Sequence, residues 1–151
     1  MKKIILTILM NAPILVANGQ ESNNPLLKNW TGPYGGVPAF NEYKINDLKP
    51  AIEVAIQEKL NEINAIATNP KPATFENTIV AMEKAGKKLT QTYAAFGIFS
   101  SNMSSPEFEP IEAEITPKFS ELNNKIYQNA KLFQRIASIY NAKEKDKLTA
   151  E

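Results

Sequence analysis

The chain has 151 residues, a formal net charge of +1 and 43% hydrophobic residues, which suits one globular domain of ordinary size. It contains no cysteine and no histidine, which excludes disulfides, thiolate or histidine-activated nucleophiles, and nitrogen or sulfur ligands for a metal. Because the charges are so evenly balanced, no nucleic-acid partner is expected.

The first nineteen residues have the features of a secretory signal peptide. Two lysines precede a mostly apolar run from Ile4 to Ala17, and small residues follow it, so that cleavage is expected before Gln20. A retained membrane anchor and a buried N-terminal helix are alternatives. The anchor fits less well, because Asn11 and Pro13 interrupt a run shorter than the ~20 residues that span a bilayer. Residues 1–19 are therefore predicted to direct export, to the periplasm or the medium, with no membrane attachment after cleavage.

Residues 20–46 are rich in Asn, Gly and Pro and are predicted to form an irregular N-terminal arm. A peptide- or phosphate-binding loop is the alternative, but Gly32, Gly35 and Gly36 match neither a P-loop nor a dinucleotide-binding pattern. The arm is expected to be pinned across the folded body by aromatic residues that follow no period: Trp30, Tyr34, Phe40 and Tyr43.

A first helix is predicted to begin at Asn46 or Asp47 as its N-cap, with Pro50 in its first turn, where the missing N–H costs little. The helix should stop at the segment 69–72, which contains two prolines, because a residue before proline avoids the helical region. Its apolar side recurs at steps of three and four: Leu48, Ile52, Ile56, Leu60, Ile63 and Ile66.

A second helix is predicted to begin after Thr74 as its N-cap and to continue without a break for about 25 residues. Gly86 lies on the apolar side of this helix, where we expect a close helix crossing. The apolar side has a heptad spacing: Phe75, Ile79, Met82, Gly86, Leu89, Tyr93 and Phe96.

A third helix is predicted after Ser105 as N-cap and Pro106 at the first helical position. Regular helix should begin near Pro110 and kink near Pro117, because each proline removes a backbone hydrogen bond. The apolar period is kept by Phe108, Ile111, Ile115, Phe119, Leu122 and Ile126.

Asn129 is predicted to cap a last helix, after which the sequence becomes highly charged. The apolar side of this helix comprises Leu132, Phe133, Ile136, Ile139 and Tyr140. Together the patterns predict an all-α fold in which long antiparallel helices form a bundle or hairpins over residues 47–151, with no sheet.

Two groups of carboxylates are candidates for reactive or metal-binding sites. Glu76 and Glu83 lie seven residues apart on one side of the second helix, and a solvated helix face is preferred because no further ligand is predicted beside them. Carboxylates in the first turns of the third helix favour the helix dipole and lack the looped oxygen cage of a calcium site: Glu107, Glu109, Glu112 and Glu114. No catalytic, cofactor-binding or metal-binding residue is therefore assigned.

Four stretches follow one another in a recognisable order: "NPLL..W..PYGGVPAF", "LKPAI", "NPKPATFENTIVAMEKAGKKL" and "EITPKFSELNNKIYQNAKLFQRIASIY". In this order they resemble the opening of the thimet-oligopeptidase family of zinc peptidases, most of all its bacterial peptidyl-dipeptidase and oligopeptidase A branch. The resemblance runs from about Asn24 to Glu151, and its most specific part is the block from Pro72 to Gly86.

The resemblance implies a mostly helical fold whose N-terminal helices form one wall of a deep channel that admits short peptides and keeps folded proteins out. It places the chemistry in a later region, where His-Glu-x-x-His and a downstream Glu bind zinc. This chain has no histidine, so no zinc ligand or catalytic residue of the family is carried over. The chain alone is predicted to be inactive and to need a C-terminal catalytic region of the same protein as its partner.

Two other functions remain open. The chain could be a stand-alone periplasmic helical module that binds peptides or a protein through an exposed apolar side. It could also be an independent enzyme whose metal is held by carboxylates alone, which stoichiometric zinc or manganese in the purified chain would support.

Overall fold

The computed structural model describes residues 23–33 and 36–142. The predicted signal peptide, residues 1–19, and Tyr34 lie outside these ranges. Within them the structure is helical, with one isolated antiparallel bridge between Thr31 and Val37 and no sheet, which confirms the predicted all-α class.

The main elements are α1 (Ile45–Ala67), α2 (Ala81–Lys84), α3 (Lys87–Asn102), α4 (Glu109–Tyr127) and α5 (Ala130–Asn141). Short 3₁₀ turns occur at Pro25–Leu27 (η2) and Phe40–Glu42 (η3), and a π-helical turn, η4, spans Glu76–Val80. No helix among the described residues combines the length and apolar character needed to span a membrane.

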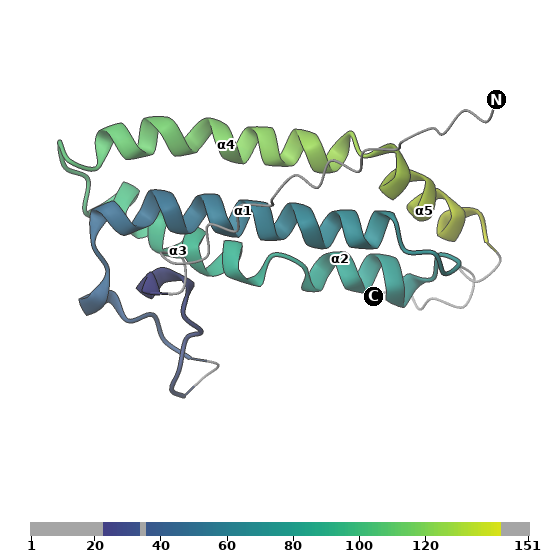
Figure 1. Ribbon diagram of the computed structural model, residues 1–151, viewed down its shortest axis with the longest axis horizontal. Coiled ribbons are helices and arrows are strands. Elements are labelled where there is room, and N and C mark those ends of the chain that lie inside the picture. Colours follow the sequence, from purple (N-terminus) through teal and green to yellow (C-terminus); the bar gives the residue numbers. More distant parts are fainter. Residues whose placement is uncertain (1–22, 34–35, 143–151) are drawn as a thin grey trace, which may run out of the picture.

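Helix α1 contacts both α3 and α4 and is drawn between α4 and the α2–α3 pair in Figure 1. Helices α3 and α4 also meet, because Tyr93 and Phe96 contact Phe119 at ring-centroid distances of 4.9 and 5.7 Å. The α2–α3 pair runs antiparallel to α1, and α4 runs in the same direction as α1 (Figure 1). Two ion pairs between α1 and α4 agree with this direction. Lys49 pairs with Glu114, and one turn later in both helices Glu53 pairs with Lys118.

The largest apolar cluster lies where α1, α3, the start of α4 and the arm meet. Phe108 is fully buried there and contacts Phe96 and Phe99, at ring-centroid distances of 5.5 and 6.1 Å. The buried members of this proximal core are Leu26, Leu48, Ala51, Ile52, Ala95, Phe96, Phe99, Phe108 and Ile115. A smaller distal cluster lies towards α5 and contains Ile63, Ile66, Ala67 and Leu132.

The arm is pinned chiefly by an aliphatic side chain. Leu26, at 2% exposed, lies in the proximal core, whereas the predicted aromatic anchors Phe40 and Tyr43 are half-buried against it with their rings 5.2 Å apart. Leu26 reaches the core because η2 turns the chain so that this side chain faces α1 and α3.

The predicted start of α1 was wrong by two to three residues, because the N-cap is Lys44 rather than Asn46 or Asp47. The helix begins at Ile45, so Asp47 lies inside its first turn and accepts a hydrogen bond from the N–H of Lys44 at 3.2 Å. Pro50 consequently lies in the second turn rather than the first. The end of α1 at Ala67, before the two prolines, agrees with the prediction.

The prediction of one unbroken second helix was wrong. The chain forms η4 and α2, breaks at Ala85 and Gly86, and then forms α3. Gly86 has φ +81°, a left-handed conformation that glycine adopts most readily. After the break Phe96 is buried, as its place on the predicted apolar side requires, but Thr92 is fully buried too, whereas Tyr93 of the predicted side is 54% exposed.

The third and last helices largely follow their predictions. Helix α4 becomes regular at Glu109, next to Pro110, as predicted. Near Pro117, where a kink was expected, the helix continues without a break to Tyr127. Asn129 caps α5 by accepting a hydrogen bond from the N–H of Leu132 at 3.0 Å. The predicted apolar side of α5 is only partly buried, because Leu132 is 3% exposed and Phe133 is 67% exposed.

Candidate functional site

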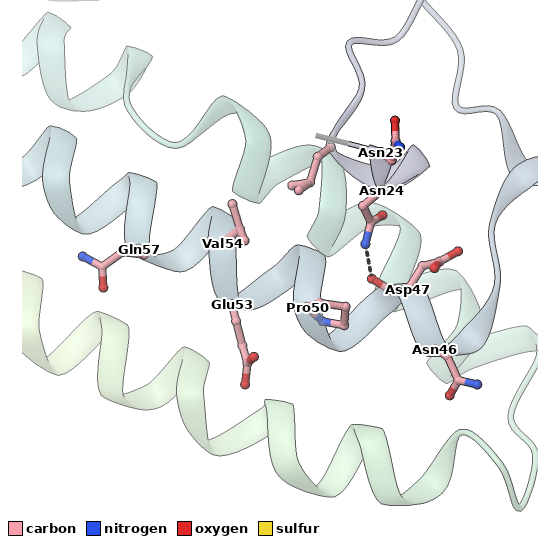
Figure 2. Close-up of a pocket in the computed structure, with 9 residues that line it drawn as sticks. Asn23, Asn24, Asn46, Asp47, Pro50, Glu53, Val54 and Gln57 are labelled. Carbon is pink, nitrogen blue, oxygen red and sulfur yellow. Dashed lines mark hydrogen bonds between the residues drawn. The ribbon is translucent and has the colours of Figure 1, made fainter. Parts of the chain in front are cut away.

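A groove of about 610 Å³ lies between the arm and α1 (Figure 2). Six of its nine lining residues are polar, and four of these carry amide side chains. The lining residues are Asn23, Asn24, Leu27, Asn46, Asp47, Pro50, Glu53, Val54 and Gln57.

Asn24 joins the two sides of the groove. Its side-chain oxygen accepts a hydrogen bond from the N–H of Leu26 at 3.0 Å and so caps η2. Its side-chain nitrogen donates to the backbone carbonyl of Asp47 on α1 at 2.8 Å (Figure 2). One asparagine therefore fixes the turn of the arm and the distance of that turn from the first turn of α1.

Pro50 shapes the α1 side of the groove. Proline has no N–H, so the carbonyl of Asn46 lacks the usual donor four residues later in the helix. The Asn46 side chain lines the same groove. The groove thus offers amide groups and a backbone carbonyl, which are groups that form hydrogen bonds with a polypeptide main chain.

The two carboxylates of the groove already have partners. Asp47 accepts from the N–H of Lys44, and Glu53 accepts from the ammonium of Lys118 at 2.7 Å. Glu53 points from α1 towards α4 (Figure 2). These partners give both carboxylates structural roles, and the groove supports binding better than it supports acid–base chemistry.

The two groups of candidate carboxylates, on the second and third predicted helices, do not come together in the structure. Glu76 pairs with Lys84 at 3.5 Å, while Glu83 is exposed, and the two do not form a common site. Glu112 accepts a hydrogen bond from the hydroxyl of Ser100 on α3, and Glu114 pairs with Lys49 on α1. Glu107 and Glu109 are exposed at the start of α4.

The Lys49–Glu114 pair is the one place among the described residues where clear pKa shifts occur. A hydrogen bond from Lys49, together with its positive charge, lowers the pKa of the Glu114 carboxyl below its ordinary value. The same hydrogen bond and the charge of Glu114 raise the pKa of the Lys49 ammonium. Both side chains lie at the surface between α1 and α4, so the pair links helices rather than activating a reactive group.

The block from Pro72 to Gly86 begins with a dense set of hydrogen bonds around Asn77. The Asn77 side chain accepts from the N–H of Thr74 at 2.9 Å and donates to the carbonyl of Pro72 at 2.9 Å. The hydroxyl of Thr74 in turn accepts from the N–H of Asn77 at 3.2 Å. Thr74 therefore acts as a cap, as predicted, and Asn77 closes the turn that leads into η4.

Arg135 of α5 completes this arrangement. Its Nη1 donates to the backbone carbonyls of Asn69 and Lys71 at 2.9 and 3.0 Å, and its Nη2 donates to the side-chain oxygen of Asn77 at 2.7 Å. The side chain is 9% exposed. Arg135 thus ties α5 to the loop that joins α1 to η4, a role that the sequence reasoning did not assign.

The end of the same block is held by two side chains of α1. Glu62 accepts from the N–H of Gly86 at 2.5 Å, and Lys59 donates to the carbonyl of Ala85 at 2.7 Å. A Cβ atom at Gly86 would lie 2.5 Å from Cδ of Lys59. The close approach expected at Gly86 is therefore present, although it occurs at a helix break rather than a helix crossing.

The residues of this chain do not fit the zinc site that the resemblance implies for the complete family. The sequence has no histidine or cysteine to serve as a ligand. Across residues 23–33 and 36–142 no three Asp or Glu side chains gather closely enough to hold a metal ion.

Most of these site features are contacts between segments that are distant in the sequence, so the sequence alone did not predict them. The sequence signals that could have indicated them are weak: Arg135 is the only arginine in the chain, and Asn24 precedes Pro25 at a turn. The helical spacing of the apolar residues does not predict that Lys59 and Glu62 contact Ala85 and Gly86.

Comparison with characterised proteins identifies relatives with matching segments. The chain is 33% identical over 128 residues to the dipeptidyl carboxypeptidase of Escherichia coli K12, covering 85% of this chain and 19% of that protein. It is 29% identical over 119 residues to the dipeptidyl carboxypeptidase of Salmonella typhimurium, with 79% and 17% covered. Oligopeptidase A of Haemophilus influenzae matches at 25% over 122 residues, with 81% and 17% covered.

No family model matches the chain. The chain spans less than one fifth of the length of each of these relatives. The similarity nevertheless extends over most of the chain, and it confirms the resemblance read from the sequence. The chain is homologous to a segment of the dipeptidyl carboxypeptidases and of oligopeptidase A, which are members of the thimet-oligopeptidase family.

Proposed function

We propose that this chain is the N-terminal scaffold of an exported zinc peptidase that hydrolyses short peptides, in the manner of a peptidyl-dipeptidase. The observation that carries the proposal is the 33% identity to the Escherichia coli dipeptidyl carboxypeptidase over 85% of this chain but only 19% of that protein. Hydrolysis and zinc binding then belong to the catalytic region that is the partner of this segment.

The internal contacts of the molecule support a scaffold role. Side chains on α1 hold α3, α4 and the break that precedes α3: Lys49 and Glu53 pair with α4, Glu58 pairs with Lys88 of α3 at 2.8 Å, and Glu62 holds Gly86. A segment cross-linked in this way keeps its shape when it borders a channel. In this proposal the scaffold forms one wall of the channel and limits the size of the substrates that enter.

Export is the second part of the proposal and rests on the signal-peptide pattern at residues 1–19. N-terminal sequencing of the product purified from the cell envelope or the medium tests it. We expect the mature chain to begin at Gln20. A product that begins at Met1 and remains in the cytoplasm would contradict export without bearing on the scaffold role.

A peptidase assay tests whether hydrolysis belongs to the catalytic region and not to this chain. The purified chain is incubated with zinc and a set of short peptides, and products are identified by mass spectrometry, with the Escherichia coli dipeptidyl carboxypeptidase as positive control. We expect no release of dipeptides from the chain alone. Cleavage that a chelator abolishes would instead support an independent enzyme with carboxylate metal ligands.

A further inference from the structure

A second cavity, of about 510 Å³, lies between α5 and the loop that follows α1. Its polar lining contains three cationic side chains and two neutral hydrogen-bonding ones: Lys71, Lys131, Arg135, Gln134 and Ser138. No Asp or Glu lines it. We call it the Arg135 cavity.

The guanidinium of Arg135 is buried without a counter-ion in the described part of the chain. All of its hydrogen-bond acceptors are neutral, namely the carbonyls of Asn69 and Lys71 and the side-chain oxygen of Asn77. Its Nε–H is buried and has no hydrogen-bond partner there. Buried charges in proteins are usually paired, and a buried donor without a partner calls for an explanation.

Two further positive charges border the same cavity. Neither Lys71 nor Lys131 forms an ion pair with another described residue, whereas five other lysines do. The cavity therefore concentrates three positive charges in a chain whose formal net charge is only +1. Such a field attracts an anion, and the partly enclosed position of Arg135 reduces solvent screening of its charge.

We propose that the Arg135 cavity binds a carboxylate group of a polypeptide. Lys71 and Lys131 would contact the carboxylate directly, Gln134 would be a neutral donor, and the charge of the buried Arg135 would add to its stabilisation. This proposal goes beyond the scaffold function and does not depend on it. The carboxylate has two possible sources, the chain's own C-terminal acids or an acidic side chain of a separate segment.

The single arginine of the sequence supplies a specific probe. In the ¹⁵N-labelled chain the Nε–Hε signal of Arg135 needs no assignment, because no other arginine contributes. N-acetyl-glutamate amide is titrated into the full chain, with N-acetyl-glutamine amide as the neutral control of equal size. We expect a saturable shift of the signal with the acid and none with the amide.

Variants at the rim separate binding from folding, because Lys71 and Lys131 are exposed and neither forms an ion pair with another described residue. Lys131→Ala and Lys71→Ala should each weaken binding of the acid about threefold, as expected for one partly exposed charge. Lys87→Ala, at an exposed lysine that does not line the cavity, is the matched control and should leave the affinity unchanged.

The same titration in a variant with Glu144→Gln, Asp146→Asn and Glu151→Gln identifies the source. If the added acid binds only when these three acids are neutralised, the chain's own C-terminal acids occupy the cavity. If it binds equally well in the unmodified chain, the source is a separate segment. Absence of a saturable response in both proteins, or an equal response to acid and amide, would overturn the proposal.

Discussion

The two ends of the molecule are stabilised in different ways. At the proximal end, Phe96, Phe99 and Phe108 bury their rings against α1 and the arm. At the distal end the apolar cluster is smaller, and Arg135 and Asn77 contribute directional hydrogen bonds to backbone groups. The difference follows from local sequence, because the prolines and the glycine at the distal end leave backbone groups that helices do not satisfy.

Phe108→Ala tests the proximal end and should have the largest effect. Phe108 is fully buried, so removal of its ring should lower the free energy of unfolding by about 3 to 5 kcal/mol. Urea denaturation followed by circular dichroism measures the change. Tyr127→Ala, at a tyrosine that is 82% exposed, is the control and should change stability by less than about 0.5 kcal/mol. Equal effects of the two substitutions would contradict the assignment of the core.

Arg135→Met tests the distal end. It keeps much of the apolar stem but removes the donors to three oxygens, so it should cost about 2 kcal/mol. Hydrogen exchange should increase in α5 and in the loop before η4, whereas α3 should keep its protection. An unchanged exchange rate in α5 would show that the hydrogen bonds of Arg135 do not hold this helix.

Gly86→Ala tests the helix break. The left-handed φ of +81° and the proximity of Lys59 should together make the substitution destabilising by about 1 to 2 kcal/mol. In a Lys59→Ala background the clash with the Lys59 side chain should disappear, and only the strain of the left-handed backbone should remain. Gly86→Ala should therefore lower the free energy of unfolding by less in that background. A cost that is the same in both backgrounds would exclude Lys59 as the crowding side chain.

The Lys49–Glu114 pair should give the smallest effect, with a defined pH dependence. The pKa of Glu114 is lowered in the folded chain, so its contribution is present above the ordinary glutamate pKa and is lost as the pH falls through the lower folded value. The pKa of Lys49 is raised, so its contribution is lost only as the pH rises through that higher value.

The difference in melting temperature between the unmodified chain and Lys49→Met measures this dependence. We expect the difference to be small and constant at neutral pH and to vanish in acid. Lys28→Met, which removes the exposed pair with Glu42 in the arm, is the matched control. A difference that persists at pH 2 would mean that Lys49 stabilises the chain through packing and not through its charge.

Features encoded by neighbouring residues could be predicted from the sequence. Asn129 caps α5 through a bond to a residue three positions later, and α1 ends where two prolines follow it. The break at Gly86 could not be predicted, because the heptad spacing continues across it. The side chains that hold the break, Lys59 and Glu62, are 27 and 24 residues earlier in the sequence than Gly86.

The groove and the Arg135 cavity could not be predicted for the same reason. Each forms between segments that are distant in sequence: the groove between the arm and α1, and the cavity between α5 and the loop after α1. Arg135 donates to residues 58 to 66 positions away. The block from Pro72 to Gly86, whose resemblance to a peptidase family could be seen in the sequence, is the segment that Arg135, Lys59 and Glu62 hold at the distal end.

The DNA that follows the codon for Glu151, translated in all three frames, provides the most direct test of the scaffold proposal. The proposal predicts several hundred further codons that include His-Glu-x-x-His on a helical pattern, with a later glutamate as the third zinc ligand. Several hundred codons without that motif in any frame would contradict it, and a stand-alone helical binding module would then be the better explanation.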